Sequence, residues 1–321
     1  MANSFQRILD LIESEIKKQP IEGRTPNLYD PVNYIMGLGG KRIRPVLAVM
    51  GNNLFGGEIS KVIPIAMALE VFHNFTLVHD DIMDNASLRR GKQTVHAKWN
   101  LATGILSGDV MLIKAYQLLM QAKPQQLDAL LKVFNQTAIE VCEGQQMDMD
   151  FESIDMVEED QYLEMIRLKT SVLLGCSLQM GAITANASAI DMAKLYHFGV
   201  NVGMGFQLMD DYLDAFGASE LVGKKTGGDI LAGKKTVMVI YTMKSESEAL
   251  RALFTKKEID DNTKVEEVKN LFVKTGADVY LKTLSDQYFK TAMGYLDSIK
   301  TDESSKKPLR ELAIGLMDRK F

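Results

Sequence analysis

The stretch Asp80-Asp81-Ile82-Met83-Asp84 places three carboxylates within five residues at the end of an almost wholly apolar run, Val62 to His79. On a helix, Asp80 and Asp84 lie one turn apart on the same face, so their oxygens converge. A buried helix that ends in clustered carboxylates is unstable unless a cation offsets their charge. Oxygen ligands of this kind suit Mg²⁺, with water and phosphate as its other ligands. For one such motif in isolation, a solvated acidic helix end is the alternative.

The same pattern returns far along the chain, in Gly205-Phe206-Gln207-Leu208-Met209-Asp210-Asp211-Tyr212-Leu213-Asp214. It again closes an apolar helical run, and the flanks also compare, because Phe75 precedes the first cluster as Phe206 precedes the second, although the spacing differs by one residue. Two such clusters favour metal binding over solvated helix ends. Basic residues that could surround them are Lys41, Arg44, Arg89, Arg90, Lys169, Lys224 and Lys234.

Composition limits the class of protein. The chain has 321 residues, 46% of them hydrophobic, which is ample for a core. A net charge of −5 argues against nucleic acid as a partner. Only Cys142 and Cys176 are present, so we expect neither a disulfide framework nor a zinc site, and we predict a reducing, cytoplasmic location. The first 18 residues do not read as a signal peptide, and we expect no transmembrane segment.

Apolar residues recur at helical spacing along nearly the whole chain, and alternating strand patterns are hard to find. The predicted fold class is therefore all-α, and without a Gly/Ser linker we expect one domain over residues 1–321. A polar segment, 93–99, is expected to cover the site. The predicted helices are 4–18, 29–36, 47–54, 62–84, 104–121, 126–148, one that carries Lys169-Thr170 through Gly181, one from near Ala187 into the second cluster, 247–254, 265–275, 277–299 and 309–317.

A basic turn follows paired glycines in Gly37-Leu38-Gly39-Gly40-Lys41-Arg42-Ile43-Arg44-Pro45. Glycines let the backbone approach a ligand, and the N-terminus of the following helix attracts anions. The pattern is compatible with phosphate binding, although alone it is also an ordinary basic turn.

Two carboxylate clusters that face each other across a helical cavity could hold metal ions that clamp a diphosphate. Negative charge that develops on a departing diphosphate would then lie on oxygens already bound to metal. If the released carbon is allylic, its positive charge is delocalised, and apolar helices would shield it from water. The chain has no Gly-x-x-x-x-Gly-Lys-Ser/Thr loop and no Gly-x-Ser-x-Gly sequence. Nucleotide hydrolysis on a P-loop is therefore not indicated.

With these motifs in order, the chain resembles the trans-isoprenyl diphosphate synthases, the polyprenyl synthetase family. The resemblance runs from about Asn33 to Phe321. It implies a helical bundle around a deep central cavity, usually in a homodimer. It also implies that an allylic diphosphate (dimethylallyl, geranyl or farnesyl) ionises and that isopentenyl diphosphate attacks the cation head-to-tail. The motifs that carry it are Gly39–Pro45, Asp80–Asp84 with Arg89-Arg90-Gly91, Gly144-Gln145 with Asp148, Lys169-Thr170, Gly205–Asp214, and Gly223-Lys224 through Lys234.

The resemblance also implies roles for individual residues. Asp80, Asp84 and Asp210 would bind Mg²⁺, three ions per active site, with support from Asp81, Asp148, Asp211, Asp214 and Gln145. The allylic diphosphate would be held by Arg89, Lys169, Lys224 and Lys234. The diphosphate of isopentenyl diphosphate would be held by Lys41, Arg44, His73 and Arg90. Thr170 and Gln207 would face the developing cation.

Side chains upstream of the first cluster set product length in this family. Phe75 and Thr76 are the fifth and fourth residues before Asp80, with Phe72 and Leu69 deeper along the helix. A single aromatic at Phe75 is similar to the geranylgeranyl type, so we expect a product of about twenty carbons, with fifteen as the alternative. A helical wheel places Thr76 nearer the Asp80 line than Phe75, so it does not single out Phe75.

Three rival functions remain open from the sequence. A longer-chain polyprenyl synthase would differ only in the cavity floor. A class I terpene cyclase shares the first cluster but resembles a different second motif and needs no second diphosphate site. A non-catalytic subunit of a heteromeric synthase would lack aspartates from one or both clusters, whereas both are intact here.

Overall fold

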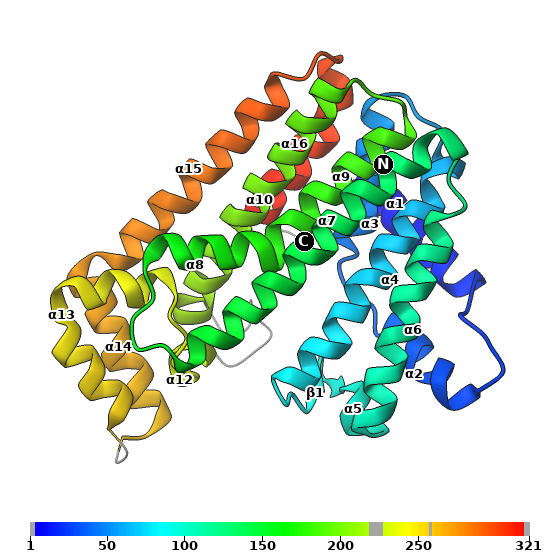
Figure 1. Ribbon diagram of the computed structural model, residues 1–321. Coiled ribbons are helices and arrows are strands. Elements are labelled where there is room, and N and C mark those ends of the chain that lie inside the picture. Colours follow the sequence, from blue (N-terminus) through cyan, green and yellow to red (C-terminus); the bar gives the residue numbers. More distant parts are fainter. Residues whose placement is uncertain (1–3, 218–226, 257–258, 318–321) are drawn as a thin grey trace.

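The computed structural model describes residues 4–217, 227–256 and 259–317, and most of them lie in helices, which confirms the predicted all-α class (Figure 1). The first half of the chain forms α1 (Ser4–Lys18), α2 (Pro26–Gly37), α3 (Ile43–Leu54), α4 (Ile59–Met83), α5 (Val95–Lys98), α6 (Leu101–Leu119) and α7 (Pro124–Ser153). The second half forms α8 (Glu159–Ile166), a π-helical turn η1 (Arg167–Ser171), α9 (Val172–Thr184), α10 (Ala189–Phe216), α12 (Gly228–Leu231), α13 (Val237–Thr255), α14 (Asp261–Thr275), α15 (Ala277–Asp297) and α16 (Glu303–Met317).

Two apolar clusters form the core. The larger joins α3, α4, α6, α7 and α9, and Leu69 and Phe72 of α4 are fully buried in it. The smaller cluster joins α10, α13, α14 and α15, and Phe272 of α14 is fully buried in it. Helix α10 belongs to both, because Phe198 lies in the first cluster and Leu208 in the second. Each such buried side chain contributes about 1.5–3 kcal/mol, so α10 is held firmly along its length.

Helix α4 runs through the larger cluster and delivers the first aspartate cluster at its end (Figure 1). Contrary to the expectation from sequence, this helix is long and apolar enough to cross a membrane by length and composition. However, 67% of its most apolar window is buried inside the protein, as in the core helix of a folded bundle. The apolar side chains of α4 are therefore explained by their burial against neighbouring helices.

One hairpin departs from the all-helical prediction. Strands β1 (Leu88–Arg89) and β2 (Lys92–Gln93) pair antiparallel, and α5 follows within the segment that was expected to be only a polar cover. The two turn residues, Arg90 and Gly91, have φ of 52° and 71°. Positive φ at both positions is typical of the type I′ turn, which suits the twist of a two-residue hairpin.

Most predicted helices are present, with shifted ends. The largest difference is α13, which starts at Val237 instead of Ser247. Glu246 interrupts it with φ −125° and ψ 36°, so the polar residues there mark a kink and not a helix start. The helix that carries Lys169-Thr170 is divided into α8, η1 and α9, a local change of pitch that hydrophobic periodicity does not reveal.

Candidate functional site

The first aspartate cluster lies where α4 ends, with Asp84 as its C-terminal cap. The side chain of Asp80 is 20% exposed, whereas that of Asp81 is 1% exposed. Burial, and then the neighbouring Asp80 carboxylate, raise the pKa of Asp84. Asp80 and Asp84 thus form a site that favours bound cations, while Asp81 points into the protein.

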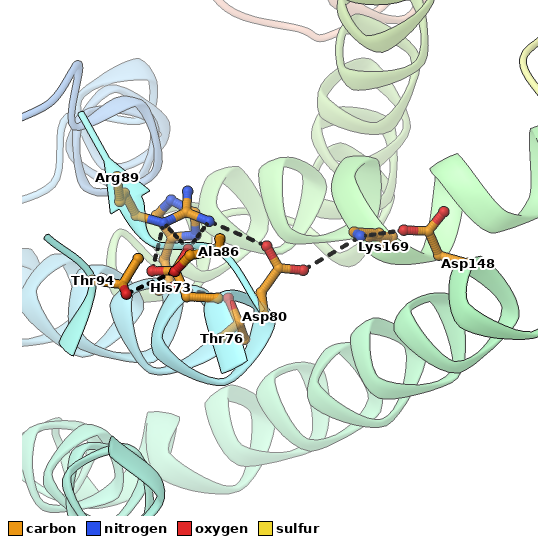
Figure 2. Close-up of polar contacts among 9 residues, drawn as sticks. His73, Thr76, Asp80, Ala86, Arg89, Thr94, Asp148 and Lys169 are labelled. Carbon is orange, nitrogen blue, oxygen red and sulfur yellow. Dashed lines mark hydrogen bonds and ion pairs between the residues drawn. The ribbon is translucent and has the colours of Figure 1, made fainter. Parts of the chain in front are cut away.

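The hairpin holds Arg89 over this cluster. Its Nε lies 2.8 and 2.9 Å from the two oxygens of Asp81, and its Nη2 lies 3.3 Å from Asp80 Oδ2 (Figure 2). Burial raises the pKa of Asp81, and the Arg89 guanidinium opposes that shift. The two ends of the hairpin are held together, because the buried hydroxyl of Thr94 donates to the carbonyl of Ala86 at 2.7 Å (Figure 2). Asp81 therefore holds Arg89 in place.

The second aspartate cluster closes α10 and is partnered differently. Asp211 is 4% exposed and accepts hydrogen bonds from Tyr162 Oη at 2.6 Å and from Gln207 Nε2 at 3.2 Å. Burial raises its pKa to about 7, against the opposing hydrogen bond from Tyr162. Asp214 accepts the backbone N–H of Asp229 at 2.9 Å, which anchors α12 to the end of α10.

Lys169 links the walls of the site. Its Nζ lies 2.5 Å from Asp148 Oδ2 and 3.4 Å from Asp80 Oδ1, so one cation lies between carboxylates of α7 and α4 (Figure 2). Burial lowers the pKa of Lys169, but Asp80 and Asp148 outweigh burial, and the net shift is upward. On the far side, Lys234 pairs with Asp229 at 3.3 Å. Both lysines remain charged and are placed to accept an anion.

Two glycines allow the π-helical turn to sit between its neighbours. A Cβ on Gly144 of α7 would lie 2.3 Å from the backbone nitrogen of Lys169. A Cβ on Gly203 of α10 would lie 2.8 Å from the Cα of Ser171. Only glycine permits such backbone approach, so α7 and α10 hold η1 closely from two sides.

A second basic group lies beside the first cluster. Arg44 Nη1 lies 3.1 Å from Nε2 of His73, and Arg90 donates to the carbonyl of Gly39. Burial, followed by the charges of Arg44 and Arg90, lowers the pKa of His73 well below its usual value. His73 is therefore neutral and accepts from Arg44. Burial also lowers the pKa of Arg44 to about 10, which leaves it charged at neutral pH.

Arg42, in the same basic turn, has a structural role. It is 3% exposed, pairs with Glu70 and Glu13 at 2.7 Å each, and donates to the carbonyl of Met36 at 2.6 Å. Its φ of 47° places it in the left-handed region at the start of α3. In the basic turn predicted from the sequence, Arg42 is thus a buried residue that holds the turn to its neighbours.

Two cavities meet at this site. A cavity of about 600 Å³ is lined by charged side chains, including Asp84, Asp148, Asp229 and Lys234. A second, of about 410 Å³, has a more apolar lining that includes Phe75. Lys169 and Thr170 line both. A ligand with a charged head and an apolar tail could therefore occupy both with its head–tail junction at these two residues.

The residues expected to set product length take different places. Phe75 and Thr76 line the more apolar cavity. Phe72 lies behind them, with ring centroids 5.6 Å from Phe75 and 5.0 Å from Phe134. Leu69 is fully buried in the core. The side chains that touch the cavity are thus Phe75 and Thr76, and Phe72 supports Phe75.

The donor set fits a hard metal ion only together with a ligand. Within residues 4–217, 227–256 and 259–317, no three His, Cys, Asp or Glu side chains are grouped closely enough to hold a metal by themselves. Asp80 Oδ1 is nevertheless buried at the lining of the cavity, with the ion pair to Lys169 at 3.4 Å but no hydrogen bond. Carboxylate oxygens on separate helices, completed by phosphate oxygens and water, form the kind of site that Mg²⁺ accepts.

The structure brings most of the predicted site residues together. Gln145 lines the more apolar cavity, and its Nε2 is buried without a hydrogen bond. Lys224 lies outside the described residues. Sequence reasoning missed Asp229 and Tyr162, which line the charged cavity. Asp229 stood within a quoted glycine- and lysine-rich stretch, but Tyr162 carried no signal, because its position depends on the π-helical turn.

Comparisons with known proteins agree with this geometry. The family model described as polyprenyl synthetase matches residues 25–274. The chain is 38% identical over 311 residues to a geranylgeranyl pyrophosphate synthase of Geoglobus acetivorans, covering 96% of this chain and 94% of that one. It is 41% identical over 219 residues to a geranylgeranyl diphosphate synthase of Methanosarcina mazei, covering 68% of each. A crystal structure of a geranylgeranyl pyrophosphate synthase superposes with a TM-score of 0.94 at 42% identity, covering 99% of both chains.

Proposed function

The chain belongs to the polyprenyl synthetase family, and on this premise we propose that it is a prenyltransferase that condenses isopentenyl diphosphate head-to-tail with an allylic diphosphate. The proposed product has about twenty carbons, as the names of several relatives suggest. The observation that carries the proposal is the meeting of a charged and a more apolar cavity at Lys169 and Thr170. Such a pair suits a substrate with a diphosphate head and a hydrocarbon tail.

The charged cavity would hold the allylic diphosphate. Bound Mg²⁺, three ions per site, would neutralise the charge that develops on the departing diphosphate. Asp80, Asp84 and Asp210 would bind these ions. Lys169 would exchange its carboxylate partners for phosphate oxygens, a change that its retained charge permits. The remaining cations proposed for the allylic diphosphate are Arg89, Lys224 and Lys234.

The second diphosphate would bind in the neighbouring basic group. Arg44 and Arg90 supply fixed charge, and neutral His73 turns a ring nitrogen toward Arg44. Arg44 Nε is buried without a hydrogen bond, so it has a donor left for a ligand oxygen. Lys41, three residues before Arg44, is the fourth proposed contact.

The carbocation would form where the cavities meet. Thr170 Oγ1 lies 3.4 Å from Gln207 Oε1, so two oxygens are placed at the junction. Oxygens fixed before the reaction stabilise a developing cation at little cost in reorganisation. Isopentenyl diphosphate then attacks the cation and a proton is lost. The walls of the more apolar cavity keep water from the cation, and Phe75 and Thr76 limit how far the growing chain extends.

We also propose a cytoplasmic homodimer. Large apolar side chains are exposed along the length of α6, and Ile139 is exposed on α7. Large exposed apolar surface marks association sites, and a second copy would cover these side chains. The α6 residues and its C-terminal cap, each 42% to 68% exposed, are Leu101, Ile105, Leu106, Ile113 and Met120.

The proposal is tested by incubating the purified protein with Mg²⁺, radiolabelled isopentenyl diphosphate and each allylic primer, and by sizing the products on a chromatogram. We expect primer-dependent incorporation that stops mainly at twenty carbons and disappears when EDTA removes the metal. A product that stops at fifteen would revise the length alone. No incorporation with any primer would overturn the proposed activity.

A further inference from the structure

Tyr162 is a buried hydroxyl that the proposed reaction does not use. It lies on α8, is 6% exposed, and donates to Asp211 Oδ2 at 2.6 Å. It also lines the charged cavity, where it lies in none of the motifs that suggested the function. A tyrosine hydroxyl that is buried needs a partner, so the question is whether this hydrogen bond does more than satisfy it.

The hydrogen bond is the first of a continuous series. Asp211 accepts from Tyr162 on one oxygen and from Gln207 Nε2 on the other, at 2.6 and 3.2 Å. Gln207 Oε1 in turn accepts from Thr170 Oγ1 at 3.4 Å. Asp211 accepts both of these hydrogen bonds, and an amide has one donating and one accepting end. With its Nε2 on Asp211, the Gln207 amide turns its oxygen toward Thr170.

The π-helical turn makes this series possible. In a regular α-helix, residues eight apart are rotated by about 80° around the axis, so Tyr162 and Thr170 would not share a face. A π-helical turn adds one residue to the helix. Thr170 lies within η1, and the wider turn places it relative to Tyr162 nearly as a residue seven apart would be, within about 20° of one face. On α10, Gln207 and Asp211 are one turn apart and meet both.

We propose that Tyr162 is a positioning residue that, through Asp211, holds the Gln207 amide with its oxygen directed toward the reacting carbon. The proposal rests on the proposed function, because it assigns Gln207 Oε1 to the carbocation. Tyr162 is well suited to this part. Its ring is packed with the smaller apolar cluster, and α8 begins with a capping box between Glu158 and Gln161, so the hydroxyl has a fixed position.

The test is Tyr162→Phe, which keeps the ring and removes only the hydroxyl. We expect kcat to fall about tenfold, the loss of one hydrogen bond to a buried carboxyl group. We expect KM for both diphosphates to stay within about twofold of wild type, because Tyr162 holds no phosphate. A purely structural tyrosine would instead lower the melting temperature and leave kcat of the folded enzyme unchanged. That result would overturn the proposal.

Tyr280→Phe is the matched control. Tyr280 Oη also donates to a carboxylate that belongs to α8, Glu159, at 2.5 Å, but neither residue lines the charged cavity. Its removal should leave kcat unchanged. An equal fall in kcat in both variants would show a general effect of loosening α8, and it would contradict a specific role for Tyr162.

A double-mutant cycle isolates the path through Gln207. In a Gln207→Leu background, the amide that Tyr162 positions is gone. We therefore expect Tyr162→Phe to change kcat by less than about twofold there. An undiminished tenfold effect would overturn the proposal. Failure of the wild-type enzyme to elongate any primer would instead refute the proposed function, so the two failures are distinguishable.

Discussion

The two aspartate clusters share the pattern Asp-Asp-x-x-Asp, yet their middle aspartates are held by opposite means. Asp81 lies against the guanidinium of Arg89, which also reaches Asp80. Among the described residues, Asp211 accepts its side-chain hydrogen bonds from neutral donors, the Tyr162 hydroxyl and the Gln207 amide. Both carboxylates are buried. The same motif therefore anchors a cation at the end of α4 and orients a neutral amide at the end of α10.

This difference suggests that the two clusters have separate roles in the site. A cation fixed beside the first cluster serves a diphosphate, since Arg89 can contact phosphate while Asp81 keeps it in place. A fixed amide beside the second cluster serves a carbon centre, because its oxygen carries a partial negative charge. Changes at the first cluster should thus act mainly on substrate binding, and those at the second mainly on turnover, except at the aspartates proposed to bind metal.

The strongest test removes a proposed metal ligand from either cluster. Asp80→Ala and Asp210→Ala should each lower kcat about a thousandfold, because developing charge on the diphosphate loses its counter-ion. Helix content by circular dichroism should hardly change. Asp128→Ala, at an exposed site on α7, is the control. Full activity in either cluster variant would refute the metal clamp.

The next test separates binding from turnover. Arg89→Gln should raise KM for the allylic diphosphate about tenfold, the value of a charge-assisted hydrogen bond, with a smaller change in kcat. Tyr162→Phe should show the reverse split. Lys92→Gln, on the exposed partner strand of the same hairpin, should leave both constants unchanged. A fall in kcat alone for Arg89→Gln would erase the distinction between the clusters.

The flanking aromatics provide a third test. Phe75 lines the more apolar cavity, whereas Phe206, its counterpart before the second cluster, does not. Phe75→Ala should shift several-fold more product beyond twenty carbons, because it opens space in the cavity wall. Phe206→Ala should leave the distribution of product lengths unchanged. If Phe75→Ala gives an unaltered chromatogram, Phe75 does not limit chain length.

The smallest expected effect concerns the hairpin. Thr94→Val removes the hydroxyl that ties the end of the hairpin to Ala86, and it leaves that carbonyl without this donor. We expect a loss of about 1 kcal/mol in stability. The looser hold on Arg89 should raise KM about threefold. Thr291→Val, which removes an exposed hydroxyl that donates within α15, is the control for both measurements. An unchanged KM would show that the hairpin holds Arg89 without Thr94.

The sequence predicted the parts of the site that depend on helical spacing. Asp80 and Asp84 could be placed on one face, and the apolar run before them predicted the buried helix α4. The partner of each middle aspartate could not be predicted, since Arg89 depends on a two-residue hairpin and Tyr162 on a change of helical pitch. Arg42 lies in the same basic turn as Lys41 and Arg44, and its burial against Glu70 could not be predicted from the sequence. Periodicity indicates which face is buried, but it does not indicate which buried side chains meet.

The π-helical turn η1 makes this protein vulnerable in a way that substitutions do not measure. It is one residue longer than an α-helical path between α8 and α9 requires. Deleting Arg167 or Leu168 would leave Tyr162 and Thr170 seven residues apart in regular helix, still within about 20° of one face. Inserting one residue at the same place, with no second wide turn to absorb it, would instead rotate α8 by about 100° relative to α9. Every motif would remain in the sequence, but Tyr162 would leave the face of Thr170. The number of residues in this turn thus matters to the site as much as the identity of its side chains.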